Sequence, residues 1–233
     1  MNRPIRVYLN LGGVRAKVPD YFLTGLAVIM SKIIYGEIQI RINEKGRVME
    51  IEKVVDVLAK SAREKGTSSV KLIPAKDIAV NDYVRMKCKF GCDNFAKRFT
   101  CPPYAPAPKE TRELLKDYNW AILVEFTGLI KKADQLDVHR MIFELEREAF
   151  LNGLHKAFGF AAGPCKLCES CPAEEIENPS EYSKKYCRNP DKARPSMEAC
   201  GIDIFKTARD AGFEINVVKG GETFKSFALL LLE

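Results

Sequence analysis

The segment GPCKLCESCP, residues 163–172, arranges three cysteines as C-x2-C-x2-C and places Pro172 directly after the last of them. A single C-x2-C pair is typical of zinc sites, whereas three thiols at i, i+3 and i+6 can wrap three corners of a larger cluster. A ferredoxin-type run continues over three residues to a fourth cysteine followed by proline, but here the next cysteine is Cys187. The spacing therefore favours an iron–sulfur cluster in a protein that is not an ordinary ferredoxin.

The eight cysteines of the chain divide into two groups. The first group has the pattern C-x3-C-x8-C and ends in the string CPPY, residues 101–104. Three thiols leave a four-ligand site incomplete, and one cysteine remains once the second group has taken four. The predicted metal ligands are Cys88, Cys92, Cys101 and Cys200 for the first group, and Cys165, Cys168, Cys171 and Cys187 for the second.

Three charged residues are candidates for tuning these centres. Arg188, Arg194 and Glu198 flank cysteines, and thiolate-ligated clusters depend on nearby donors and charges. Glu198 could instead simply favour a helix N-terminus. The only histidines, His139 and His155, do not neighbour a cysteine in sequence and are expected in surface or core roles. Their scarcity argues against Cys2His2 zinc sites and most histidine-based acid–base catalysis.

Size, composition and cysteine usage indicate a globular, cytoplasmic protein. The 233 residues are 46% hydrophobic, enough to bury a substantial core. The cysteines cluster as metal ligands do rather than as a disulfide framework, which indicates a reducing compartment. The longest apolar run, at 21–34, is too short to span a bilayer, so no membrane association is expected.

The net charge of +6 is concentrated in the first 48 residues, which hold eight Lys and Arg against three acidic residues. A second basic patch surrounds the first cysteine group. It could bind phosphates, but its interleaving with cysteines favours a role in offsetting the charge of a thiolate-rich cluster. The patch consists of Arg85, Lys87, Lys89, Lys97 and Arg98.

Hydrophobic periodicity predicts an α/β or α+β fold, with a mixed sheet, flanking helices and two cysteine-rich loops. Residues 1–48 form either a small β-α-β unit, with strands at 5–11 and 38–42 around a helix at 20–34, or an extension before a true start at Met49. Residues 49–233 form the cysteine-rich domain. Its predicted helices cover 50–65, 134–158 and 196–211, with another starting at 108; its strands cover 70–73 and 120–126, with a C-terminal β-hairpin at 213–218 and 224–232.

Several strings resemble a family of uncharacterised prokaryotic predicted metal-binding proteins, a domain-of-unknown-function family common in anaerobes. The strings are KCKFGC at 87–92, TCPPY at 100–104, GPCKLCESC at 163–171, CR at 187–188 and RPSMEACGID at 194–203. The likeness covers about residues 49–233. It implies that the cysteines bind metal, and it supplies no substrate or reaction.

Three functions are compatible with these patterns. The first is one or two [4Fe-4S] clusters used in electron transfer or redox chemistry, with a redox protein or a small molecule as partner. The second is a zinc-structured module that binds nucleic acid or a protein through the basic loop at 85–98, although nucleic acid is the less favoured partner. The third is an enzyme whose open iron acts as a Lewis acid, which applies if Cys200 does not close the first site.

Overall fold

The computed structural model describes residues 8–11, 14–17, 51–130, 136–176 and 184–233. The chain divides into two units, Met1–Ile51 and Glu52–Glu233. No helix within the described ranges combines the length and apolarity needed to cross a bilayer. All eight cysteines belong to the second unit.

The first unit contains a short antiparallel ribbon. Strand β1 (Tyr8–Leu11) pairs with β2 (Val14–Lys17). The end of the strand expected at 5–11 is therefore present, but its partner follows at once instead of after a helix. The helix expected at 20–34 and the strand expected at 38–42 lie outside the described residues.

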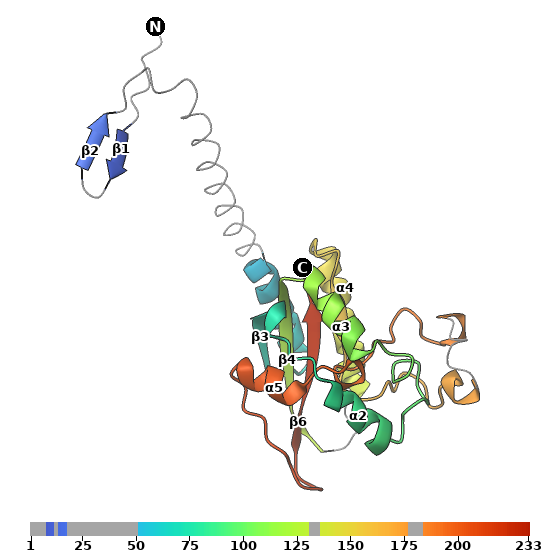
Figure 1. Cartoon of the computed structure of the whole chain (residues 1–233). Coiled ribbons are helices and arrows are strands. Elements are labelled where there is room, and N and C mark those ends of the chain that lie inside the picture. Colours follow the sequence, from blue (N-terminus) through green and yellow to red (C-terminus); the bar gives the residue numbers. More distant parts are fainter. Residues whose placement is uncertain (1–7, 12–13, 18–50, 131–135, 177–183) are drawn as a thin grey trace. The chain divides into compact units, whose positions relative to one another are not determined.

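The second unit is built on a four-stranded antiparallel sheet in the order β3-β4-β6-β5 (Figure 1). The strands are β3 (Ser69–Pro74), β4 (Trp120–Leu129), β5 (Phe158–Phe160) and β6 (Phe224–Leu231). The strands predicted at 70–73 and 120–126 and the final strand are confirmed. Because every pair is antiparallel and helices flank the sheet, the fold belongs to the α+β class.

One face of the sheet carries the main core. Leu123 of β4 and Leu229 of β6 are fully buried there, together with Phe160 of β5. The segment that contains Met197 and Cys200 packs against the same core cluster. The cysteine-bearing part of the chain is therefore attached directly to the most buried face of the sheet.

Helix α4 (Leu136–Leu151) lies close to β5 and β6. A Cβ at Gly159 of β5 would come within 2.9 Å of Ile142 Cγ1, so glycine permits this approach. The helix over residues 51–64 neighbours α4, since Lys65 Nζ, just after it, contacts Glu144 Oε2 at 2.6 Å. Both helices follow the predicted apolar periodicity.

The predicted C-terminal β-hairpin is wrong in its first arm. Strand β6 pairs with β4 on one edge and with β5 on the other, so no edge remains for residues 213–218. These residues form no strand, and Phe213 and Ile215 are buried in the core instead. The helix expected to reach residue 158 stops at Leu151, and residues 158–160 form β5, the second neighbour of β6.

The helix predicted over 196–211 is divided at Gly201. The first part is a 3-10 turn, η8 (Glu198–Cys200), and the second is α5 (Ile204–Asp210). Gly201 has φ 79° and closely approaches Pro108, the first residue of α3 (Pro108–Leu114). A left-handed backbone ends the helical run, so Cys200 does not lie in the first turn of an α-helix.

The loop predicted around the first cysteine group is partly helical. Helix α2 (Asp82–Gly91) carries Cys88, and Cys92 follows its last residue. No proline interrupts these residues, because the prolines of this region begin at Pro102. Figure 1 shows the green loop after α2 beside the orange loop after β5, and Arg98 Nη1 donates to the Cys168 carbonyl between them at 3.4 Å.

Candidate metal centres

The second cysteine group converges on one cavity of about 20 Å3. Three of its thiols come from the loop after β5, and the fourth follows the short 3-10 turn η7 (Lys184–Tyr186). Pro172 begins the 3-10 turn η5 (Pro172–Glu175), so the chain leaves the cysteine loop directly after the third thiol. The cavity wall contains Cys165, Cys168, Cys171 and Cys187.

Hydrogen-bond donors face the sulfur atoms of this group. Asn189 Nδ2 donates to Cys168 Sγ at 3.0 Å. Burial raises the pKa of Cys165 and Cys187, and a backbone N–H opposes this rise at each thiol, from Leu167 and from Asn189 respectively. Such donors stabilise thiolates, which are the forms that bind metal. The donor set therefore fits a metal or an iron–sulfur cluster.

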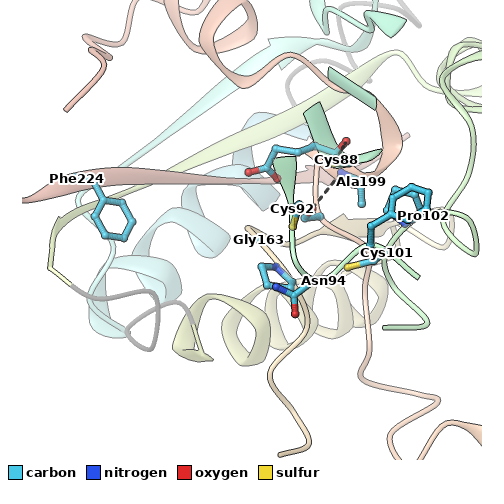
Figure 2. A pocket seen from close by; sticks show the side chains of 12 residues that line it. Cys88, Cys92, Asn94, Cys101, Pro102, Gly163, Ala199 and Phe224 are labelled. Carbon is cyan, nitrogen blue, oxygen red and sulfur yellow. Dashed lines mark hydrogen bonds between the residues drawn. The ribbon is translucent and has the colours of Figure 1, made fainter. Parts of the chain in front are cut away.

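The first cysteine group faces a larger cavity of about 380 Å3, which we call the first cavity. Its wall includes Cys88, Cys92 and Cys101, and also Gly163 and Pro164 at the start of the second cysteine loop. Figure 2 shows Phe224 at the end opposite to Cys101. Three predicted ligands thus share one space with room beside them for a small molecule.

A half-buried guanidinium, that of Arg85, lies beside the first group. Arg85 donates to the carbonyls of Pro106 at 2.9 Å, Ala105 at 3.2 Å and Ala199. Burial lowers the pKa of Arg85, and the nearby thiols of Cys200, Cys88 and Cys101 act against this lowering. A guanidinium stays protonated in proteins, so Arg85 supplies a fixed positive charge to thiolates formed there.

The other basic residues of this patch have two different positions. Arg98 is half-buried on the wall of the second group's cavity, where it donates to the Cys168 and Glu169 carbonyls. Its guanidinium also lies 3.9 Å from Glu174. The three lysines of the patch are exposed. The arginines, rather than the lysines, are therefore placed to offset negative charge at the cysteines.

Cys200 lies behind the first group. Its side chain is fully buried in the main core cluster, and it is not part of the first cavity's wall. Burial raises the pKa of Cys200 to about 12, with Arg85 opposing this rise. Cys88 and Cys101 are near enough to raise it further. The structure brings Cys200 close to the other three thiols without exposing it to the cavity that they share.

The two cysteine groups are neighbours. Burial raises the pKa of Cys101 to about 12, and Cys165 of the second group adds to that rise. No three Cys, His, Asp or Glu side chains in the described ranges already have the spacing that a bound metal ion imposes. Ligation therefore requires the cysteine side chains to move closer together, and a four-iron cluster would also have to widen the second group's cavity.

A family model described as "Predicted metal-binding protein (DUF2284)" matches residues 71–232. The chain belongs to this family. The matched region contains all eight cysteines and every strand of the four-stranded sheet except the first two residues of β3. No curated protein and no solved structure matches the chain.

The three charged candidates differ in what they contact in this family member. Arg188 lines the second group's cavity and donates to the Ser170 carbonyl at 2.8 Å, so it holds the cysteine loop through its backbone. Arg194 instead pairs with Glu146 of α4, its Nε donating to Oε2 at 2.7 Å. Glu198 lies on the wall of the first cavity. Arg194 thus anchors the segment before η8 to α4.

The two histidines occupy a core and a surface position, the two kinds of position that the sequence suggested. His139 is buried on α4, and His155 is exposed. Burial lowers the pKa of His139 to about 4, although the carbonyls of Pro164, Ala162 and Gly163 oppose this change. The imidazole is therefore neutral at pH 7, and it packs beneath the chain that leads into the second cysteine loop.

Sequence reasoning missed two functional candidates. Asn189 follows Cys187 by two residues and was not singled out from the sequence, whereas its amide contacts the sulfur of Cys168. Arg85 was one of five basic residues, and nothing in the sequence distinguished it from the lysines. The signal available for both was only their nearness to a cysteine in sequence.

Proposed function

We propose that this member of the metal-binding family carries a [4Fe-4S] cluster on Cys165, Cys168, Cys171 and Cys187. The observation that carries the proposal is the N–H···S contact of Asn189 with Cys168 within a cavity lined by all four thiols. Hydrogen bonds to cluster sulfurs and burial set the potential of such centres. The i, i+3, i+6 spacing of the first three thiols suits a cluster better than a single ion.

The protein's own residues perform three tasks in this proposal. The four thiolates hold the cluster, which when bound accepts and donates one electron at a time. Asn189 and the backbone N–H groups orient the sulfur atoms and balance their charge. Arg188 and Arg98 fix the loop by donating to its carbonyls, and so limit its movement. Electron transfer to a partner protein is the function that these features support best.

A second candidate function is favoured by the first cavity. Its volume of about 380 Å3 is within the range of small-molecule sites, and three thiols line it. A metal held there by three thiolates would keep one position for a small molecule. Because the second group lies alongside, an electron could pass between the two centres. We therefore propose a small-molecule redox reaction at the first group as the alternative to simple electron carriage.

Anaerobic purification tests the iron–sulfur proposal. We expect a brown protein that contains iron and acid-labile sulfide and absorbs broadly near ~400 nm, as iron–sulfur charge transfer does. Cys171→Ser should remove most of the iron of the second group, whereas the adjacent control Ser170→Ala should keep it. A colourless protein with zinc and no sulfide would contradict the proposal and favour the zinc-structured module.

A further inference from the structure

The first cavity contains a carboxylate that the three thiols do not explain. Glu198 opens the 3-10 turn η8, and its side chain lies on the cavity wall with Cys88, Cys92 and Cys101. The turn is joined to α2, because Cys88 Sγ lies 3.8 Å from the Glu198 carbonyl oxygen. Glu198 therefore belongs to the immediate surroundings of the first cysteine group.

The carboxylate is held in place on one side only. Burial raises the pKa of Glu198, while its own backbone N–H, the Ser196 hydroxyl and the Gly163 N–H act against this rise by stabilising the charged form. Ser196 is itself fixed, since its Oγ accepts from the Ala199 N–H at 3.1 Å. The other oxygen, Oε2, is buried and has no hydrogen-bond partner among the described residues. A buried carboxylate oxygen without a donor is suited to a cation.

Cys200 is less well placed to serve the same centre. Its backbone carbonyl accepts from the Thr111 hydroxyl at 2.8 Å, and Thr111 is fully buried. The Cys200 side chain packs in the core cluster and does not reach the cavity wall. To ligate a metal in the first cavity it would have to leave the core, whereas Glu198 is already on the wall.

We propose that Glu198 is the fourth protein ligand of the first centre, beside Cys88, Cys92 and Cys101. The proposal rests on the proposed function only in that this group holds a metal. Iron and zinc both accept a carboxylate oxygen beside thiolates. The half-buried guanidinium of Arg85 would offset part of the charge of three thiolates and one carboxylate.

A carboxylate ligand also gives the site an exchangeable position. A second hollow, of about 440 Å3, shares Glu198 and Phe224 with the first cavity. A small molecule entering from either space meets the metal where Glu198 binds it. Oxygen is a harder ligand than sulfur and is more easily replaced on a soft, thiolate-bound metal. The ligand expected to replace it is a small anion or a thiol.

The test compares single variants of the full chain, reconstituted anaerobically with 57Fe and sulfide. Glu198→Gln and Cys200→Ala are the test variants, and Glu175→Gln is the matched control, because Glu175 is an exposed carboxylate in the second cysteine region. For each variant we measure how fast a chelator removes the iron, and we record the Mössbauer spectrum. We expect Glu198→Gln to lose first-centre iron at least ~10-fold faster and to lose the signal of the oxygen-bound iron, on the scale that loss of ligand-shell residues causes. Cys200→Ala and the control should match the wild type.

Retained iron in Glu198→Gln would overturn the proposal, whether or not Cys200→Ala loses it. If both variants lose iron, Glu198→Cys decides: a ligand role predicts that the new thiolate restores iron, and failure to restore it contradicts that role. If the wild-type protein contains no acid-labile sulfide, the iron–sulfur proposal is wrong, but the assignment of Glu198 as a metal ligand is not affected. Zinc bound per chain would then be counted in the same variants, and the same pattern of loss is expected.

Discussion

At the scale of single residues, the cysteine sites depend on neighbours that donate to sulfur or supply charge. Asn189 contacts Cys168, Arg85 lies among the thiols of the first group, and Glu198 faces the first cavity. None of these is a cysteine, and each lies within three residues of one in the chain. Their roles follow from where the side chains point, so single substitutions can separate them.

Replacing Asn189 by alanine should lower the reduction potential of the second group's cluster. Reduction adds negative charge to the cluster, and the amide donor at 3.0 Å from Cys168 Sγ stabilises that charge. A hydrogen bond worth about 1 kcal/mol corresponds to about 40 mV for one electron. Anaerobic redox titration measures the shift. Asn152→Ala removes an amide donor to the Glu148 carbonyl at the end of α4 and should leave the potential unchanged.

Replacing His139 by phenylalanine should reduce the loss of stability in acid. The pKa of His139 is about 4 in the folded protein and about 6.5 when unfolded, so the unfolded state binds the proton first. The contribution of neutral His139 to the free energy of unfolding is fully present above pH ~6.5 and is lost as the pH falls towards ~4. The total loss amounts to about 3 kcal/mol. Urea unfolding across this range measures it. Equal pH dependence in the two proteins would contradict the prediction.

At the scale of elements, close approaches fix where the cysteine segments meet the fold. Gly201 separates η8 from α5 and lies against Pro108, and Gly159 lets α4 approach β5. The turn η8 then joins α2 and the first cavity. A backbone change at these positions should therefore affect both stability and the cysteine site.

Replacing Gly201 by alanine should destabilise the second unit by about 2 kcal/mol. Its φ of 79° is costly for a residue with a Cβ, and that atom would lie 2.6 Å from Pro108 Cγ. Chemical denaturation measures the change. Gly220→Ala is the matched control, since no atom lies within 4 Å of the added Cβ, and its stability should change by less than about 0.5 kcal/mol. Equal effects of the two substitutions would contradict this account.

At the scale of the whole molecule, a four-stranded sheet and its helices support two cysteine-rich loops. Most residues of the sheet strands β4 and β6 are buried, whereas most of the cysteine loop after β5 is only half-buried. The loops therefore have less apolar packing of their own than the sheet does. The loops should therefore depend more strongly than the sheet on bound metal for their ordered structure.

Removal of metal should raise proteolytic cutting within 85–108 and 163–196, while the helices at 51–64 and α4 stay protected. Ligation cross-links these loops, whereas the helices are held by buried apolar side chains such as Leu58 and Leu145. Limited proteolysis before and after chelation, followed by mass spectrometry, locates the cuts. Unchanged cutting in the demetallated protein would show that packing alone orders the loops.

A truncated protein that begins at Met49 should retain its full metal content. Residues 1–48 contain no cysteine or histidine, and the cysteine-bearing sheet lies within residues 52–233. Metal per chain and solubility are compared with those of the full chain. Loss of either on truncation would make residues 1–48 an integral part of the metal-binding fold.

The sequence by itself determined the cysteine groups, most helices and three strands of the sheet, because ligand spacing and apolar periodicity are local properties. It also indicated metal binding, which is what the matching family model describes. The break at Gly201, the pairing of β6 with β5, and the exclusion of residues 213–218 from the sheet depended on the tertiary structure. In each case, segments far apart in the chain compete for the same space or the same strand edge. A local sequence pattern contains no information about such competition.

The same distinction holds at the candidate sites. Spacing alone grouped the thiols, but only the fold placed Cys200 in the core and Glu198 on the cavity wall. Glu198 and Cys200 are two residues apart, and in a tight turn such a separation directs side chains to different sides. Burial and direction, rather than sequence distance, therefore decide which of the two reaches the first cavity.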